Sequence, residues 1–239
     1  FSCNYIATGH YARKKASLIG IAKDSWKDQS FMLYRLSEKQ REKLLLPLGQ
    51  KMKDEVKNFV QQCGYEEIAN KRESFGLCFT NGKHYSEFLL EKYPELKKLE
   101  NGKVFNKNNQ VIGTHKGYPF YTIGQYKGLN CEGKQYINKI IAEENAIFVG
   151  EKSECYFSTL RLNSLVFSQN IENIKKDTPY LTKIRGKDEG NFATLREISP
   201  NHSIIEFSQK VFAPMQGQDV VVYDENNFIL FGGRIESFS

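Results

Sequence analysis

The sequence predicts three parts: an α/β segment, a small central unit and a C-terminal β-barrel. Apolar residues at helical spacing follow the polar loops of the first part, and the composition shifts toward Lys, Glu and Asn after Pro94. Short alternating segments separated by turn residues fill the last 80 or so positions, as in small closed barrels. The predicted domains are therefore 1–93, 94–157 and 158–239.

The composition indicates a weakly basic protein whose cysteines are reduced. The 34 basic and 28 acidic side chains among 239 residues give a net charge of +6, which is compatible with a nucleic-acid partner. The five cysteines are odd in number and far apart, so neither a disulfide framework nor a metal site is predicted. We expect free thiols and a cytoplasmic location. Because no apolar run reaches the roughly 18 residues of a membrane span, no membrane partner is expected.

The first residues predict a strand and a turn. Tyr5 to Ala7 is typical of a short buried strand, and Thr8-Gly-His10 of the turn that leaves it. Gly9 would let a nucleotide approach the backbone, although an ordinary strand-end turn explains the same residues. Since a domain rarely begins on such a strand, we expect this chain to be the back part of a longer protein.

A polar cluster, Lys27-Asp-Gln29, leads into an apolar run after a probable strand at 17–22. These side chains could bind a polar ligand, or Asp28 could mark the positive end of a helix. Ser37 and Gln40 form a capping-box pattern that opens a short helix.

A longer helix is predicted from Lys53 to Cys63. Val56, Phe59, Val60 and Cys63 recur at i, i+3, i+4 and i+7, which predicts a core-facing stripe and a structural Cys63.

Cys78 stands in the segment Ser74-Phe-Gly-Leu-Cys-Phe79, two residues after a glycine. A tight turn there could present the thiol to a cleft, and the nearby Lys71 and Arg72 would favour the nucleophilic thiolate. A small buried hydrophobic side chain is the alternative.

The central unit follows a helix at 85–93 and an exposed linker or hairpin at 95–110. In residues 117–129, Gly and Lys alternate with aromatics, which suits either base stacking or a tight core turn. A hairpin is predicted from residues 135–142 and 146–150. The barrel strands are predicted near 160–167, 180–185, 192–198, 203–208, 219–224 and 228–234.

Taken together and in order, these segments resemble the tRNA-specific 2-thiouridylases. The matching blocks run from Asn4-Tyr-Ile-Ala-Thr-Gly-His-Tyr-Ala-Arg13 through Lys27-Asp-Gln-Ser-Phe-Met-Leu-Tyr-Arg-Leu36, Pro47-Leu-Gly49, Ser74-Phe-Gly-Leu-Cys-Phe79 and Tyr121-Thr-Ile-Gly-Gln125 to Gly217-Gln218 and Gly232-Gly233.

The resemblance implies a pyrophosphatase-type nucleotide-binding domain, a central domain and a C-terminal β-barrel. It implies ATP-dependent sulfur transfer to C2 of the wobble uridine, position 34 of tRNA, through a cysteine persulfide, with ATP and magnesium as cofactors and a sulfur-donor protein as partner. The family's persulfide position corresponds to Cys78 and its ATP-contacting glycine to Gly9. The tRNA contacts correspond to Lys27, Asp28 and Gln29, and to Arg185 and Gly186 on the barrel.

Several departures qualify the resemblance. The family's Ser-Gly-Gly-x-Asp-Ser phosphate loop and its second catalytic cysteine are missing from this sequence, and we expect both upstream of Phe1. The chain alone is therefore predicted to be inactive. Gly186 stands where the family has Tyr, Tyr126 where it has Arg, and Gln216 where it has Pro.

Three basic clusters suggest how tRNA would be held: Lys27 to Gln29, Lys116 to Lys127 and Lys183 to Lys187. The last could equally be a solvated strand edge. A non-catalytic tRNA-binding module is the alternative function, and a sulfurtransferase acting on a small molecule is a third.

Overall fold

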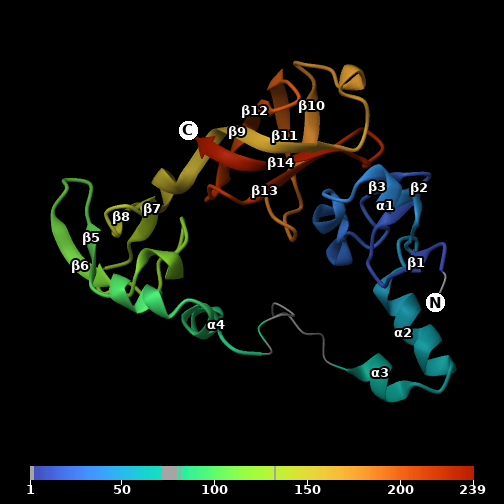
Figure 1. Cartoon of the computed structure of the whole chain (residues 1–239), viewed down its shortest axis with the longest axis horizontal. Helices are drawn as coiled ribbons and strands as arrows, with labels where there is room; N and C mark the ends of the chain where they lie inside the picture. The colour runs from blue at the N-terminus through green and yellow to red at the C-terminus, as the bar shows by residue number, and fades with distance from the viewer. Residues whose placement is uncertain (1–2, 72–79, 81, 132) are drawn as a thin grey trace. The chain divides into compact units, whose positions relative to one another are not determined.

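The computed structural model of the chain describes residues 3–71, 80, 82–131 and 133–239. The chain divides into two compact units (Figure 1). Unit 1 combines residues 1–71 with 158–239, and unit 2 comprises residues 72–157. Segments far apart in the sequence therefore fold together in unit 1.

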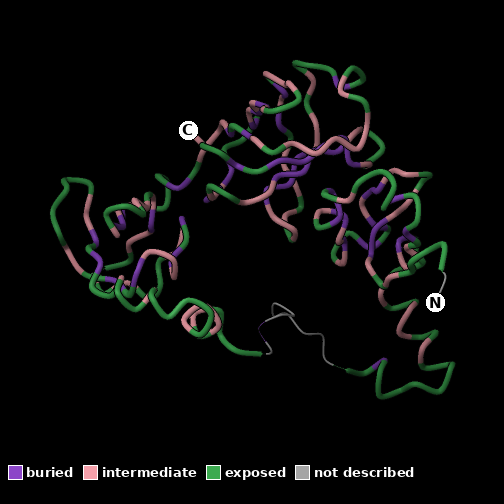
Figure 2. The backbone as a smooth tube through the Cα atoms, viewed as in Figure 1, coloured by how far each residue is buried: buried purple, intermediate pink, exposed green. Residues whose placement is uncertain are grey.

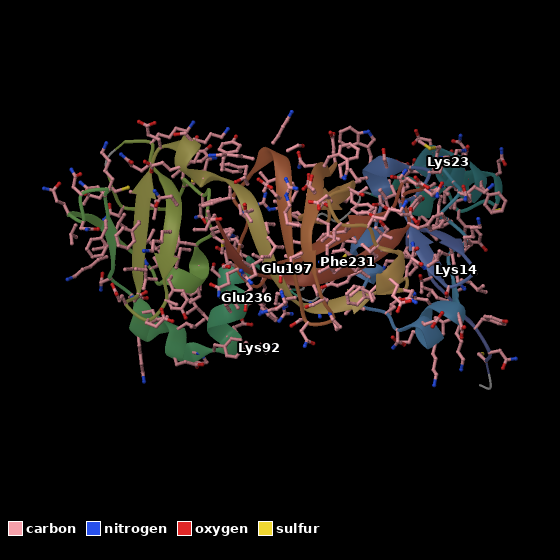
Figure 3. All side chains as sticks on the ribbon, turned by 90° about the horizontal axis from the view of Figure 1, so that it is seen from above. Lys14, Lys23, Lys92, Glu197, Phe231 and Glu236 are labelled. Atoms are coloured by element: carbon pink, nitrogen blue, oxygen red, sulfur yellow. The ribbon has the colours of Figure 1, made fainter. Side chains whose placement is uncertain are left out.

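A closed six-stranded barrel dominates unit 1, which confirms the predicted barrel. Its strands neighbour one another in the order β10-β11-β12-β9-β14-β13. Their bounds are β9 Tyr156–Phe167, β10 Pro179–Lys183, β11 Asn191–Ile198, β12 His202–Phe212, β13 Asp219–Tyr223 and β14 Ile229–Phe238. Apolar side chains at alternate positions fill the interior, among them the fully buried Leu162 and Leu195. Phe231, which is also fully buried, is labelled in Figure 3.

The N-terminal part of unit 1 consists of short elements. A parallel pair joins β1 Ile6–Ala7 to β4 Leu44–Leu45, and an antiparallel pair joins β2 Arg13–Lys15 to β3 Leu18–Gly20. The remaining elements are η1 Ser25–Lys27, η2 Ser30–Leu33, α1 Glu38–Glu42, α2 Lys53–Gln62 and α3 Glu66–Asn70. The capping box of α1 is confirmed, because Gln40 Oε1 accepts from the Ser37 amide at 2.8 Å.

This N-terminal part packs on the barrel wall through a second apolar cluster. The cluster joins side chains such as Leu33 and Tyr34 to Tyr223 on β13 and Ile229 on β14. Gly232 lets the Tyr34 ring lie against β14, since an added Cβ would collide with that ring. The two segments of unit 1 thus share one core.

Two predictions about burial are wrong. The strand at Tyr5 to Ala7 was expected to be buried, yet Ile6 is 66% exposed and β1 pairs only with β4 among the described residues. The apolar stripe of α2 was expected to face a core, yet no residue of α2 is buried and Cys63, just beyond it, is exposed (Figure 2). Helical periodicity reports which face is apolar and leaves open what covers that face.

Unit 2 contains a helix and a mixed sheet. Helix α4, Tyr85–Lys92, is followed by η4, Pro94–Leu99, where a linker was one prediction. The sheet has the order β6-β5-β8-β7, and β7 and β8 form the predicted hairpin. Its strands are β5 Gly102–Phe105, β6 Val111–His115, β7 Tyr136–Ile141 and β8 Ala146–Gly150, with the short turns η5 Tyr118–Phe120 before β7 and η6 Lys152–Cys155 after β8.

Candidate functional site

A buried ion pair connects the loop around Asp28 to the barrel. Lys183 Nζ lies 2.8 Å from Asp28 Oδ2, and the two side chains are only 5% and 1% exposed. The pair spans 155 residues of sequence. Burying two charges is costly unless further hydrogen bonds satisfy them, so the rest of the coordination decides whether this pair is stable.

The Asp28 carboxylate has three further donors. Its Oδ1 accepts from the amides of Ala22 at 3.0 Å and Ser30 at 3.1 Å, and its Oδ2 accepts from Ser30 Oγ at 2.9 Å. The carboxylate is thus occupied by contacts within the protein. These contacts show that its side chain organises the loop. The sequence-based prediction that Asp28 contacts tRNA stays a prediction.

Tyr223 extends the network into the barrel wall. Its hydroxyl lies 3.0 Å from Ser30 Oγ, and Lys183 Nζ lies 5.7 Å from the centre of its ring. Burial raises the pKa of Tyr223, with the nearby Asp28 charge adding to the increase, so the hydroxyl stays protonated. The network therefore joins η2, β10 and β13.

Gln29 ties the same loop to the turn that carries Gly9. The Gln29 side chain accepts from the Tyr11 amide at 3.0 Å, and the Gln29 amide donates to the Tyr11 carbonyl at 2.7 Å. Gly9 is exposed, its φ lies outside the left-handed range, and among the described residues an added Cβ would meet only Leu48, at 3.8 Å. Neither backbone strain nor packing requires glycine there, which leaves room for a ligand to approach the backbone.

The barrel residues predicted to contact tRNA border this loop. An added Cβ on Gly186 would lie 3.7 Å from the Phe31 ring, and Arg185 donates to the Ala213 carbonyl. Six of the seven predicted site residues therefore lie in this loop of unit 1 or in segments that adjoin it. The seventh, Cys78, lies outside the described residues.

Lys183 requires a correction. It was counted with Arg185 and Lys187 in a basic cluster able to attract phosphates. The structure buries it against Asp28, so its charge is neutralised inside the protein. Lys187 in the same segment is exposed.

Sequence reasoning missed Trp26 and Asp24. Trp26 is 85% exposed beside Lys27, at the tip of the turn η1. Asp24 is buried and anchors that turn, because its Oδ2 accepts from the Lys53 amide at 2.9 Å at the start of α2. A lone tryptophan within a polar loop was the signal that could have identified the exposed ring.

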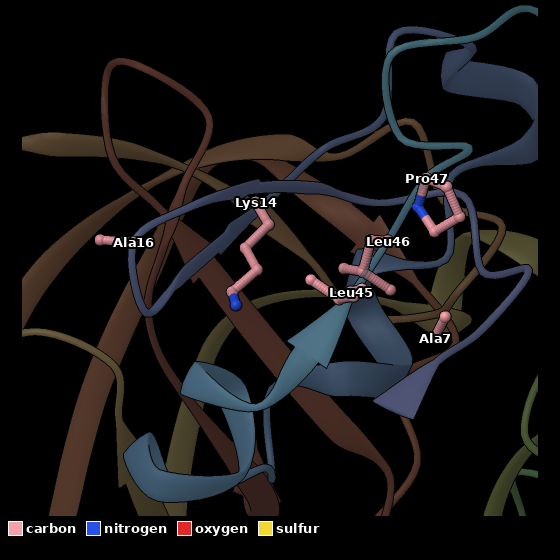
Figure 4. A pocket seen from close by; sticks show the side chains of 6 residues that line it. All are labelled: Ala7, Lys14, Ala16, Leu45, Leu46 and Pro47. Carbon is pink, nitrogen blue, oxygen red and sulfur yellow. The ribbon is translucent and has the colours of Figure 1, made fainter. Parts of the chain in front are cut away.

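A pocket of about 580 Å³ lies beside β1 and β4 (Figure 4). Its lining is apolar except for Lys14, and it consists of Ala7, Lys14, Ala16, Leu45, Leu46 and Pro47. Lys14 Nζ donates to the carbonyls of Glu42 at 3.0 Å and Leu44 at 2.7 Å, so it serves the local backbone. None of the six predicted site residues that the structure describes lines this pocket.

The described part of the chain holds no metal-type cluster of side chains. Within it, no three His, Cys, Asp or Glu residues gather as a metal site would require. Among the same residues, no helix has the length and apolar character needed to cross a membrane.

Comparison with known proteins identifies the family. Residues 1–82 match the tRNA methyl transferase HUP domain, and residues 86–151 match the tRNA methyl transferase PRC-barrel domain. A tRNA-specific 2-thiouridylase MnmA of Chlorobium phaeobacteroides strain BS1 is 34% identical over 246 residues, covering 98% of this chain and 67% of the relative. The chain belongs to the tRNA-specific 2-thiouridylase family.

Other members of the family agree. The 2-thiouridylase of Cytophaga hutchinsonii is 31% identical over 98% of this chain, and that of Natranaerobius thermophilus is 34% identical over 98%. The chain spans 65% and 64% of these two relatives. The order of HUP-type domain, small central domain and six-stranded barrel confirms the predicted fold class, while the exact domain boundaries remain a proposal.

Proposed function

We propose that this protein takes part in forming 2-thiouridine at the wobble position of tRNA. The observation that carries the proposal is the match of 97–98% of the chain to 2-thiouridylases at 31–35% identity. The contacts around the Asp28 loop support it, because they link the exposed turn at Gly9, which is predicted to contact ATP, to a barrel segment predicted to face RNA.

Cys78 is proposed to carry the sulfur as a persulfide. Two of the other cysteines are poorly suited, since burial raises the pKa of the Cys131 and Cys155 thiols and so disfavours their thiolates. The Cys155 thiol also donates a hydrogen bond to the Ile137 carbonyl at 3.3 Å. The terminal sulfur of the Cys78 persulfide would attack C2 of the adenylated uridine and displace AMP. A second cysteine would then attack Cys78 Sγ, which forms the disulfide and releases the thiolated base.

Gly9 is proposed to contact ATP. Its exposed backbone and the open space around it fit the close approach of a nucleotide. ATP, when bound, supplies the adenylyl group that turns the C2 oxygen into a leaving group. Magnesium, a sulfur-donor protein and a cytoplasmic location belong to the same proposal.

Lys27, Gln29 and Arg185 are proposed to face tRNA, with Asp28 holding them in register. Asp28 fixes the loop from inside, so Lys27 and Gln29 are held at defined positions beside the barrel. Replacing Lys27 or Gln29 with Ala should reduce turnover more than tRNA affinity. An equal loss of both would contradict a role near the base.

Thiolation of tRNA by the full-length protein tests the sulfur carrier. With ATP, a sulfur donor and unmodified tRNA, nucleoside mass spectrometry should detect 2-thiouridine with the native protein and none with Cys78→Ser. Cys63→Ser is the matched control, because Cys63 is exposed and outside the site network, and it should retain activity. Normal thiolation by Cys78→Ser would refute the sulfur assignment, whereas tRNA binding without thiolation by any variant would favour the non-catalytic module.

A further inference from the structure

Unit 2 carries a cluster of two tyrosines and two lysines that no predicted site includes as a whole. Tyr126 and Tyr136 have ring centroids 5.4 Å apart at an interplanar angle of 47°. Lys134 Nζ lies 4.8 Å from the centre of the Tyr126 ring and 5.7 Å from that of Tyr136. Lys127 Nζ lies 5.7 Å from the centre of the Tyr126 ring. We call these four residues the Tyr126 cluster.

The cluster stands on a rigid loop. The Gly124 amide donates to the Ile137 carbonyl at 2.7 Å, and the Ile137 amide donates to the Gln125 carbonyl at 2.9 Å. These bonds tie the residues before Tyr126 to the start of β7, where Tyr136 lies. Both tyrosines are therefore held by one backbone ladder, with little ordering left for binding.

Hydrogen bonds also fix the loop on the other side of Tyr126. The Tyr121 hydroxyl donates to the Gly128 carbonyl at 2.9 Å, and Gln125 Nε2 donates to the Lys127 carbonyl at 2.7 Å. Gly124 and Gly128 have φ angles of 81° and 82°, which the turn needs and which favour glycine. The Gly-rich sequence around Tyr126 thus builds the loop, while the side chains of Tyr126, Lys127 and Lys134 remain exposed.

Charge favours an anionic ligand. Two ammonium groups approach the same tyrosine ring, and among the described residues neither Lys127 nor Lys134 takes part in an ion pair. An ammonium over a ring face keeps hydrogen-bond donors for another partner. Tyr126 remains 42% exposed, so part of its ring is open to a flat ligand.

We propose that the Tyr126 cluster binds an unpaired nucleotide of RNA. Lys127 and Lys134 contact the phosphates, and the exposed part of the Tyr126 ring stacks against the base. Stacking on aromatic side chains beside a basic groove is how proteins bind single-stranded nucleic acid without reading its sequence. The inference rests on the proposed function, which supplies tRNA as the RNA, and it adds a contact on the central domain.

The test separates stacking from charge by measuring tRNA affinity over a range of salt concentrations. Tyr126→Leu should weaken binding about 5-fold or more without altering the slope of log affinity against log salt. Lys127→Gln with Lys134→Gln should reduce the steepness of that slope by about 0.7 for each phosphate that is no longer neutralised. Tyr126→Phe keeps the ring and should bind like the native chain.

Lys139→Gln is the matched control for charge. Lys139 Nζ also lies over an aromatic ring, at 5.5 Å from the centre of Phe148. Lys139 is on β7, like Tyr136, but it is not part of the Tyr126 cluster. This variant should change the slope less than the loss of either cluster lysine. If Lys139→Gln changed the salt slope as much as the loss of a cluster lysine, the lysines of the cluster would contribute only general charge attraction, and the proposal would be overturned.

Ultraviolet crosslinking of the unaltered chain to tRNA gives a second readout that needs no variant. The crosslinked peptide should contain Tyr126 or Tyr136. If tRNA binds but the variants keep native affinity and the crosslinks fall elsewhere, the cluster is not a nucleotide site. If the unaltered chain binds no tRNA at all, both this inference and the tRNA partner of the proposed function are wrong.

Discussion

Lys183 and Lys134 place the same ammonium group in opposite surroundings. In unit 1, Lys183 is 5% exposed and pairs with a carboxylate inside a hydrogen-bonded network. In unit 2, Lys134 is exposed and lies over two tyrosine rings. A buried charge stabilises a fold only through its partners, whereas a surface charge remains available to a ligand. The two lysines therefore differ in what their removal should affect.

The largest expected effect is on stability and concerns Lys183. Lys183→Met leaves the Asp28 carboxylate buried without its counter-charge, which should lower the free energy of unfolding by about 3–5 kcal/mol. Lys134→Met, the matched surface variant, should stay within about 0.5 kcal/mol of the native chain. Denaturant unfolding measures both.

A double variant tests whether charge is the cause. Asp28→Asn keeps an acceptor for the Ala22 and Ser30 amides while it removes the negative charge. Combined with Lys183→Met, it should recover a large part of the lost stability. If Lys183→Met and Lys134→Met were equally stable, the buried ion pair of Lys183 would contribute no more to stability than the exposed Lys134 does.

Gly232→Ala should have the next largest effect. The added methyl group meets the Tyr34 ring, so overpacking should cost about 1–3 kcal/mol in the free energy of unfolding. Gly186→Ala is the control within the same unit, because its Cβ would lie 3.7 Å from Phe31, an ordinary contact, and it should cost less than about 0.5 kcal/mol. If both variants unfold alike, the close packing of Tyr34 on β14 does not matter for stability.

Lowering the pH should reduce the stability of unit 2, because it protonates the buried His115. This residue is 4% exposed, its Nδ1 accepts from the Gly117 amide at 3.0 Å, and burial lowers its pKa. Because the folded pKa lies below the unfolded value of about 6.5, stability is fully present above that pH and falls as the pH drops toward the folded pKa.

Hydrogen exchange at the Gly117 amide should report this loss. The protection factor of this amide, which is its intrinsic exchange rate divided by its observed rate at the same pH, should fall as the pH drops below about 6.5. His84→Asn, at an exposed histidine of the same unit, should leave the dependence in place. Protection of Gly117 that stays constant between about pH 7 and about pH 5 would contradict a neutral, structural His115.

The smallest effect is a spectroscopic one in unit 1. Trp26 is the single tryptophan of the chain and is 85% exposed, so its emission should be that of a hydrated indole that iodide quenches readily. If RNA contacts the loop at Lys27, tRNA should quench this emission and protect it from iodide. Unchanged fluorescence at saturating tRNA would place the contact away from Trp26.

Much of the fold follows from local sequence. Alternating apolar residues specify the barrel strands, because only one face of each strand meets the interior. The Ser37 and Gln40 pair specifies the start of α1, since two side chains satisfy two terminal amides within one turn. The site was recognised by resemblance, and its seven residues were named without knowledge of their surroundings.

What the tertiary structure alone decided is which polar groups face inward. Lys183 precedes Ile184 of the barrel core and belongs by sequence to a basic segment, yet it meets Asp28 across 155 residues. The spacing of apolar residues in α2 identifies its apolar face, but whether that face is buried depends on which other element packs against it, and no residue of α2 is buried. Sequence patterns record the preferences of single side chains, whereas burial is a property of the partners that the fold brings from elsewhere in the chain.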